Sequence, residues 1–431
     1  MPTPGDTLMH HSIGTVHDPT APDTATPTAL EDVTLPCGRR ADVVLHGDRI
    51  ESVDDHRPGH HRPGAYRLGG ALLLPALVDG HCHLDKTLLG SPWQPHRTSP
   101  TLREQIATER LSRRNTQAPA TERAAALARR MVSLGTGHVR SHVDIDPDVQ
   151  LTGLHALLAV REQFRTRLGI QLVAFPQSGV VTAPGVADLL DAALADGADV
   201  IGGLDPAGFD GDVDGQLNVV FGLAERHGAG VDIHLHDGGE AGAHQLREIA
   251  TRTKALGLGG KVTVSHAYAL GQLDDHDLDR VAEALARAGV AIMTNGPSRS
   301  MPPVLRLREH GVRVFAGSDN IRDTWWPYGT ADMLERATII GLQGELMTDD
   351  DLRYAAALAT DEAAAALGLT DYGLAPGKRA DVVAVAAGSV PEAVASHPER
   401  LLVLHGGRIV GPTPLTTIRI QPPTFEDSRD H

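Results

Sequence analysis

Eight short apolar runs, separated by longer segments rich in Ala, Leu and Arg, are the feature of this sequence that most limits its possible folds. The runs cover residues 72–83, 138–145, 170–179, 200–206, 230–237, 261–267, 290–296 and 312–320. Most of the segments between them have the apolar spacing of amphipathic helices, as in 184–197 and 278–289. Continuously apolar strands that alternate with helices indicate a parallel sheet covered by helices. Because there are eight such units, we predict a closed (β/α)8 barrel, or TIM barrel. An open doubly wound sheet is the alternative, but no G-x-G-x-x-G motif follows any of the runs.

Similar segments near the two ends of the chain predict a second, smaller domain. Residues 41–53 alternate between apolar and polar and contain a turn, as a β-hairpin does. Residues 377–388 and 400–411 repeat the ADVV and HG-x-RI phrases of that hairpin. We therefore expect both ends to contribute strands to one small β-sandwich. The expected division is a disordered extension over 1–28, the β-sandwich over 29–74 and 371–420, and the catalytic barrel over 75–370.

Charge and composition exclude several classes of partner. The chain has 39 Lys and Arg against 55 Asp and Glu, a net charge of −16, so bulk charge favours neither a nucleic acid nor an anionic membrane. It contains no run of about 18 uncharged apolar residues, which a membrane-spanning helix needs. Two cysteines are too few for a disulfide framework or a thiolate zinc cluster. The first residues lack the pattern of a signal peptide, and we expect a cytoplasmic homo-oligomer that acts on a small molecule.

Ionisable and amide side chains recur where the predicted strands end. In a (β/α)8 barrel the catalytic residues lie at the carboxyl ends of the strands, so these side chains are expected to meet at one rim. Their positions are His81, His83, His142, Gln177, His234, His236, Asp237, His266 and Asp319.

The spacing of His81 and His83 predicts a metal site. Residues two apart on a strand face the same side, so both imidazoles point into the barrel mouth and Cys82 points to the wall, where we expect a buried, inert thiol. A third histidine from 230–237 and a carboxylate from 312–320 complete a donor set of three nitrogens and one oxygen. Such a set suits Zn²⁺ or Fe²⁺.

With these residues in view, the chain resembles the amidohydrolase superfamily, and within it the cytosine deaminase-like branch. The resemblance covers nearly everything after residue 29. It rests on VDGHCHLDKT (78–87), HVDID (142–146), QLVAFPQSG (171–179), GSDNIRDTWWPYGTADML (317–334) and LAPGKRADVV (374–383).

The resemblance implies a ligand set and a metal count. It implies that His81, His83, His234 and Asp319 bind one divalent ion and that His266 lies beside the metal-bound water. Members with two metals need a bridging lysine at the end of the fourth strand, where this chain reads Gly-Leu-Asp-Pro over 203–206. We therefore expect one Zn²⁺ or Fe²⁺ per chain.

The resemblance also implies how a ring would be held and protonated. Gln177 is expected to contact the heterocycle, since an amide both donates and accepts hydrogen bonds. Asp237 stands where the branch has a glutamate that carries protons to the ring. Trp325 would either stack on the ring or pack within its loop. We expect His142 to hydrogen-bond to a metal-site residue.

These expectations combine into one leading function. The metal makes hydroxide available at neutral pH, Asp319 accepts the proton of water, His266 stabilises the developing charge, and Asp237 protonates the ring. We predict a hydrolytic deaminase of a small amino N-heterocycle, such as a cytosine-like pyrimidine or a triazine. A hydrolase of a cyclic amide or of an N-alkylamino ring is the close alternative. A catalytically silent scaffold is the alternative from another class.

Overall fold

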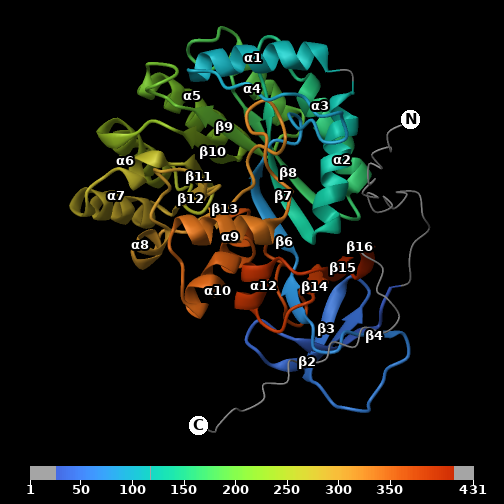
Figure 1. Ribbon diagram of the computed structural model, residues 1–431. Helices are drawn as coiled ribbons and strands as arrows, with labels where there is room; N and C mark the ends of the chain where they lie inside the picture. The colour runs from blue at the N-terminus through green and yellow to red at the C-terminus, as the bar shows by residue number, and fades with distance from the viewer. Residues whose placement is uncertain (1–25, 117, 412–431) are drawn as a thin grey trace, which may run out of the picture.

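The computed structural model describes residues 26–116 and 118–411, and it confirms the (β/α)8 architecture (Figure 1). Eight strands pair in sequence order, and each pairing is parallel. They are β6 (Leu77–Cys82), β7 (Thr136–Asp144), β8 (Gly169–Phe175), β9 (Val200–Leu204), β10 (Gly230–Leu235), β11 (Val262–His266), β12 (Val290–Thr294) and β13 (Val314–Ala316). The first and last strands meet where the Asp319 amide donates to the His81 carbonyl at 2.7 Å, which closes the barrel.

Helices cover the outside of the barrel because their apolar faces pack on the apolar strands. Those that follow β6 to β13 in the barrel are α1 (Leu102–Asn115), α2 (Ala120–Ser133), α3 (Thr152–Phe164), α4 (Val186–Ala195), α5 (Val213–His227), α6 (Gly239–Ala255), α7 (Asp275–Ala288), α8 (Val304–Glu309) and α9 (Met333–Gln343). The other helical elements are η1 (Tyr268–Gly271), α10 (Asp349–Leu358), α11 (Asp361–Ala366) and α12 (Val390–Ser396). No helix in the described part of the chain is long and apolar enough to cross a membrane.

The two ends of the chain form one eight-stranded sheet with its own core, as the repeated phrases predicted. Figure 1 shows its blue and red strands side by side below the barrel. Its strands are β1 (Ala29–Thr34), β2 (Arg40–His46), β3 (Arg49–Asp55), β4 (Ala65–Arg67), β5 (Leu72–Pro75), β14 (Val382–Val385), β15 (Arg400–His405) and β16 (Arg408–Gly411). The domain boundaries stay a prediction, and residues 1–25 and 412–420 of the predicted units lie outside the described residues.

The apolar run 72–83 divides between the two sheets. Its first half, β5, pairs antiparallel with β14 in the small sheet, and its second half, β6, pairs parallel with β7 in the barrel. The change occurs at Pro75, which has no N–H for a sheet hydrogen bond, and at Ala76, whose N–H donates to Asp381. One continuous apolar segment therefore ties the small sheet to the barrel strand that carries the histidine pair.

Candidate metal centre

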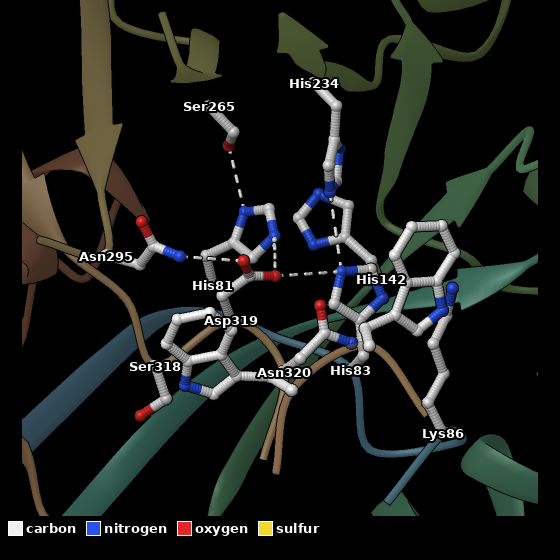
Figure 2. Close-up of polar contacts among 12 residues, drawn as sticks. His81, His83, Lys86, His142, His234, Ser265, Asn295, Ser318, Asp319 and Asn320 are labelled. Carbon is white, nitrogen blue, oxygen red and sulfur yellow. Dashed lines mark hydrogen bonds and ion pairs between the residues drawn. The ribbon is translucent and has the colours of Figure 1, made fainter. Parts of the chain in front are cut away.

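Four side chains converge at the carboxyl end of the barrel, as Figure 2 shows. His81 and His83 come from the end of β6, His234 from β10, and Asp319 follows β13. The Nε2 atoms of His83 and His234 face each other at 3.4 Å. Asp319 Oδ1 lies 3.4 Å from His83 Nε2 and 3.5 Å from His81 Nε2. The structure thus brings together the four side chains that the resemblance implied as metal ligands.

The separations suit one tetrahedral ion. Ligands about 2.1 Å from such an ion have donor atoms about 3.4 Å apart, because the angle between them is tetrahedral. Three of the six separations among the four donor atoms, 3.4, 3.4 and 3.5 Å, match this value. His81 Nε2 is buried and has no hydrogen-bond partner among the described residues, so the atom is open to a metal. The donor set therefore fits a divalent ion of the zinc or iron type.

The protonation states also suit a metal. Burial lowers the pKa of His83 and of His234 well below the usual value, so both imidazoles are neutral and can act as ligands. Burial would raise the pKa of Asp319, but its contacts with His81 and His83 outweigh burial and hold it well below its usual range. The site therefore presents three imidazoles and a carboxylate anion.

A buried chain of hydrogen bonds, from His81 through Ser265 to Asp232, sets the tautomer of His81. Asp232 is ionised: burial raises its pKa, but His142 and Arg140 outweigh this and lower it. Because a carboxylate only accepts, the Ser265 hydroxyl donates to Asp232 Oδ1 at 2.7 Å. The same hydroxyl must then accept from His81 Nδ1 at 2.9 Å. The proton of His81 consequently sits on Nδ1, and Nε2 is left bare for the metal. The sequence reasoning missed this relay, since its members lie inside apolar strands.

Asp319 is held by the strands beside it. Its backbone has φ 61°, in the left-handed region that a non-glycine residue rarely adopts and that is frequent at functional sites. Its Oδ2 accepts from Asn295 at 2.8 Å, which turns Oδ1 towards the histidines. Arg336 on α9 donates to the carbonyls of Asn295 and Ser318 and fixes both strand ends.

His266 and His142 lie beside the four ligands in different ways. His266, at the end of β11, has a donor atom within 4.8 Å of those of His81, His234 and Asp319. Burial lowers its pKa well below the usual value, so it is a neutral base. His142 has no hydrogen-bond partner among the described residues; its ring stacks on that of His81, with centroids 3.9 Å apart, and its Nε2 lies 3.6 Å from Asp232 Oδ1. It supports the ligand by packing.

A cavity of about 190 Å³ opens beside the centre. This is smaller than the roughly 300 to 1,000 Å³ of pockets for drug-sized ligands, so it suits a small molecule. Its wall includes ring and amide side chains from several strand ends: Phe175, Gln177, His236, His266, Tyr268, Asn295, Asn320, Trp325 and Trp326. A larger cavity of about 540 Å³ beside α2 has no histidine or aspartate among its described lining residues.

A loop turn presents Trp325 to this cavity. Asp323 accepts from the backbone amides of Trp325 and Trp326 and from Asn320 Nδ2, so Asn320 and Asp323 shape the turn. Trp325 Nε1 donates to Glu109 on α1 at 2.7 Å, which anchors the indole at the pocket wall. One face of the cavity is therefore aromatic.

Lys86 and Gln177 stand together at another wall of the cavity. Lys86 Nζ donates to Gln177 Oε1 at 2.5 Å and lies 3.0 Å from Asp144 and 3.3 Å from Glu109. The sequence placed Gln177 correctly at the rim but gave Lys86 no role. A lysine three residues after the histidine pair, in a chain with lysines only at 86, 254, 261 and 378, was the available signal.

The structure brings His236, and not Asp237, to the cavity. On an extended strand the second residue after His234 faces the same side and the third faces the other. His236 lines the cavity, and its Nδ1 lies 2.8 Å from Asp205 Oδ2. The carboxylate of Asp237 instead accepts from the Gly208 amide at 2.8 Å and from Gln245 at 2.9 Å. The placement expected for Asp237 ignored this alternation.

Cys82 occupies the position that the strand pattern implies. Cys82 is completely buried between the histidines, and burial raises its pKa well above the usual value, so it is an inert thiol. Cys37 is exposed in the small sheet domain.

Comparison with known proteins agrees with this geometry. The sequence profile of the Amidohydrolase family matches residues 67–411. The chain belongs to the amidohydrolase family. This family is metal-dependent, and the resemblance to its cytosine deaminase-like branch is confirmed.

Three relatives of this amidohydrolase cover most of its length. N-isopropylammelide isopropyl amidohydrolase of Pseudomonas sp. (strain ADP) is 32% identical over 375 residues, which cover 86% of this chain and 93% of that protein. The structure of N-isopropylammelide isopropylaminohydrolase from Burkholderia multivorans ATCC 17616 has 43% identity and a TM-score of 0.85, over 89% of this chain and 97% of that one. The structure of 5-methylcytosine deaminase from Klebsiella pneumoniae, liganded with 5-fluorocytosine, has 28% identity and a TM-score of 0.81, and the match covers 91% of this chain and 99% of that one.

Proposed function

We propose that this amidohydrolase uses one divalent metal ion to hydrolyse an exocyclic C–N bond of a small N-heterocycle. The observation that carries the proposal is the convergence of three imidazoles and a carboxylate, with donor atoms 3.4 to 3.5 Å apart in three of their pairs, beside a small cavity with aromatic and amide walls. The relatives support it, since their names describe hydrolysis of N-isopropylammelide and deamination of 5-methylcytosine.

A single ion is the proposed content, held by His81, His83, His234 and Asp319. The fourth strand ends in Leu204 and is followed by Asp205, which is engaged with His236 and offers no bridging ligand. We expect Zn²⁺ or Fe²⁺, which suit imidazole and carboxylate ligands. When bound, such an ion supplies a water nucleophile at neutral pH by lowering the pKa of water towards about 7.

The surrounding residues would move protons and hold charge. Asp319 accepts the proton of the attacking water, because its carboxylate is ionised and Asn295 occupies only one of its oxygens. His266 is a neutral, buried base that would orient the attacking water by accepting a hydrogen bond from it, while the electron pair of the attacked C=N bond passes to the ring nitrogen. His236, oriented by Asp205, replaces Asp237 in our proposal as the group that carries a proton to the ring or leaving nitrogen.

The cavity walls would hold the ring flat. Trp325 offers an aromatic face whose indole is anchored by Glu109, so stacking does not require the side chain to be ordered on binding. Gln177 offers a hydrogen bond to the ring edge.

Release of an alkylamine is the second candidate, and a specific observation favours it. The N-isopropylammelide isopropylaminohydrolase structure shares 43% of its residues with this chain, against 28% for the 5-methylcytosine deaminase. The same groups would serve both reactions, because only the substituent on the leaving nitrogen differs.

A screen of aminopyrimidines, aminopurines, aminotriazines and their N-alkyl derivatives tests the proposal. Ammonia or alkylamine release by the metal-loaded chain, lost in Asp319→Asn, is the expected result. Metal-loaded protein that releases no amine from any ring, or Asp319→Asn with normal turnover, would contradict it.

A further inference from the structure

Three polar side chains lie inside the barrel directly below the metal centre, where such barrels are usually filled by branched apolar residues. They are Arg140 on β7, Asp232 on β10 and Thr263 on β11, and each is at most 5% exposed. Each stands two positions before a residue at the metal centre, and residues two apart on a strand face the same side. A buried cation and a buried anion therefore lie one layer below the metal ligands.

Arg140 is held facing Asp232 by contacts in several directions. Its Nη1 donates to Asp232 Oδ2 at 2.9 Å and to Thr263 Oγ1 at 3.1 Å. Its Nε donates to Gln171 Oε1 at 2.7 Å on β8, and its Nη2 donates at 3.3 Å to the carbonyl of Ala366, the last residue of α11. Four different elements therefore supply its acceptors, and the guanidinium has one orientation.

The contact with Arg140 continues to the metal centre through hydrogen bonds of fixed direction. An arginine can only donate, so Asp232 Oδ2 must accept. The other oxygen, Oδ1, accepts from Ser265 at 2.7 Å, and Ser265 accepts from His81 Nδ1 at 2.9 Å (Figure 2). Asp232 thus accepts from both sides. A buried carboxylate without a cation is costly, and Arg140 supplies that cation.

We propose that Arg140 is a positioning residue of the metal centre: it keeps Asp232 an acceptor at both oxygens, and so holds the proton of His81 on Nδ1 and leaves Nε2 free for the ion. The inference rests on the proposed function only in taking His81 as a metal ligand. Arg140 acts through Asp232 and Ser265, since it is not among the described residues that line the cavity.

The Asp232→Asn variant separates this role from that of an ion pair that only fills the core. Because Arg140 only donates, the oxygen of the new amide must face it, and the NH2 group must face Ser265. The Ser265 hydroxyl then accepts from the amide and donates to His81 Nδ1. The proton of His81 consequently moves to Nε2, the atom that would bind the metal. An ion pair with a packing role alone would leave the tautomer unchanged.

Two measurements on the full-length chain follow this change. After metal removal, long-range proton–nitrogen correlation NMR shows which nitrogen of His81 carries the proton, and the spectrum of His81→Ala identifies its signals. Competition with a chromophoric chelator measures the affinity for Zn²⁺. We expect the proton on Nδ1 in the parent chain and on Nε2 in Asp232→Asn, whose Zn²⁺ affinity should be about tenfold to a hundredfold lower.

Two further variants and a control complete the set. Arg140→Lys keeps a cation that can only donate, so the proton should stay on Nδ1. The double variant Arg140→Gln with Asp232→Asn removes both charges together, so neither end fixes the direction and both tautomers should be seen. Arg400→Gln is the matched control, because Arg400 on β15 is also 5% exposed and pairs with Asp332. It should lower the free energy of unfolding without changing the tautomer or the Zn²⁺ affinity.

The outcomes separate the inference from the proposed function. An unchanged tautomer in Asp232→Asn, an unchanged Zn²⁺ affinity after the proton has moved, or equal effects of Arg400→Gln and Asp232→Asn would overturn the inference. The expected tautomers and affinities, in a metal-loaded parent chain that releases no amine, would leave the inference standing and overturn the proposed function. Should Asp232→Asn fail to fold, because Arg140 loses its partner, the double variant decides, and a proton on Nδ1 alone would overturn the inference.

Discussion

The Ser265→Ala variant examines the claim that His81 binds metal through Nε2. Ser265 connects His81 Nδ1, at 2.9 Å, to ionised Asp232, at 2.7 Å, and so keeps the proton on Nδ1. Without the hydroxyl, the two His81 tautomers become closer in energy and the ring loses its orientation. Loss of such a supporting hydrogen bond weakens metal binding by about tenfold to a hundredfold, or about 1.4 to 2.8 kcal/mol.

Competition with a chromophoric chelator measures this change directly. Ser141→Ala is the matched control, because Ser141 is an equally buried serine whose hydroxyl, among the described residues, contacts only backbone groups, the amide of Leu84 and the carbonyl of His142. Both variants should lose about 1 to 3 kcal/mol of unfolding free energy without metal, since each leaves buried polar groups unpaired. Only Ser265→Ala should lose metal affinity. Equal metal affinities in the two variants would refute the reasoning.

Four further variants probe other parts of the account. His83→Ala should lose both the bound metal and turnover. Metal analysis per chain and the amine-release assay measure these two losses. If His83→Ala still binds its ion, His83 is not a ligand. His236→Gln should keep the metal and lower kcat by about 10² to 10⁴-fold, whereas Asp237→Asn should have a much smaller effect; the reverse order would return the proton-transfer role to Asp237. Burial lowers the pKa of His405 to about 4, although Asp381 acts in the opposite direction. As the pH falls below about 6.5, the histidine therefore takes up a proton in the unfolded chain but not in the folded chain, and the folded chain becomes less stable. Denaturant unfolding at pH 7 and pH 5 measures this effect. Between these pH values the free energy of unfolding of His405→Gln should fall by about 2 kcal/mol less than that of the parent chain, and an equal fall would contradict the buried neutral state.

Much of the fold and the ligand set could be predicted because both depend on short-range periodicity. The alternation of a strand is enough to place His81 and His83 on one face, and the barrel topology is enough to bring Asp319 to the same rim. The same alternation, applied to 234–237, would have placed His236 in the cavity and Asp237 outside it.

The contacts that orient the site could not be predicted, because they join residues far apart in sequence. Ser265 and His81 are 184 positions apart, and Lys86 and Gln177 are 91 apart. No local pattern marks Ser265, since a single hydroxyl inside an apolar strand is equally compatible with a structural role. The division of 72–83 between two sheets likewise depends on which partner strands are present.

Anomalous X-ray scattering, recorded at the absorption edges of zinc and iron on crystals of the metal-loaded protein, tests the central claim most directly. The account predicts one peak per chain, within about 2.0 to 2.3 Å of donor atoms from His81, His83, His234 and Asp319. Two peaks at the barrel mouth, or one peak that touches fewer than these four side chains, would contradict it.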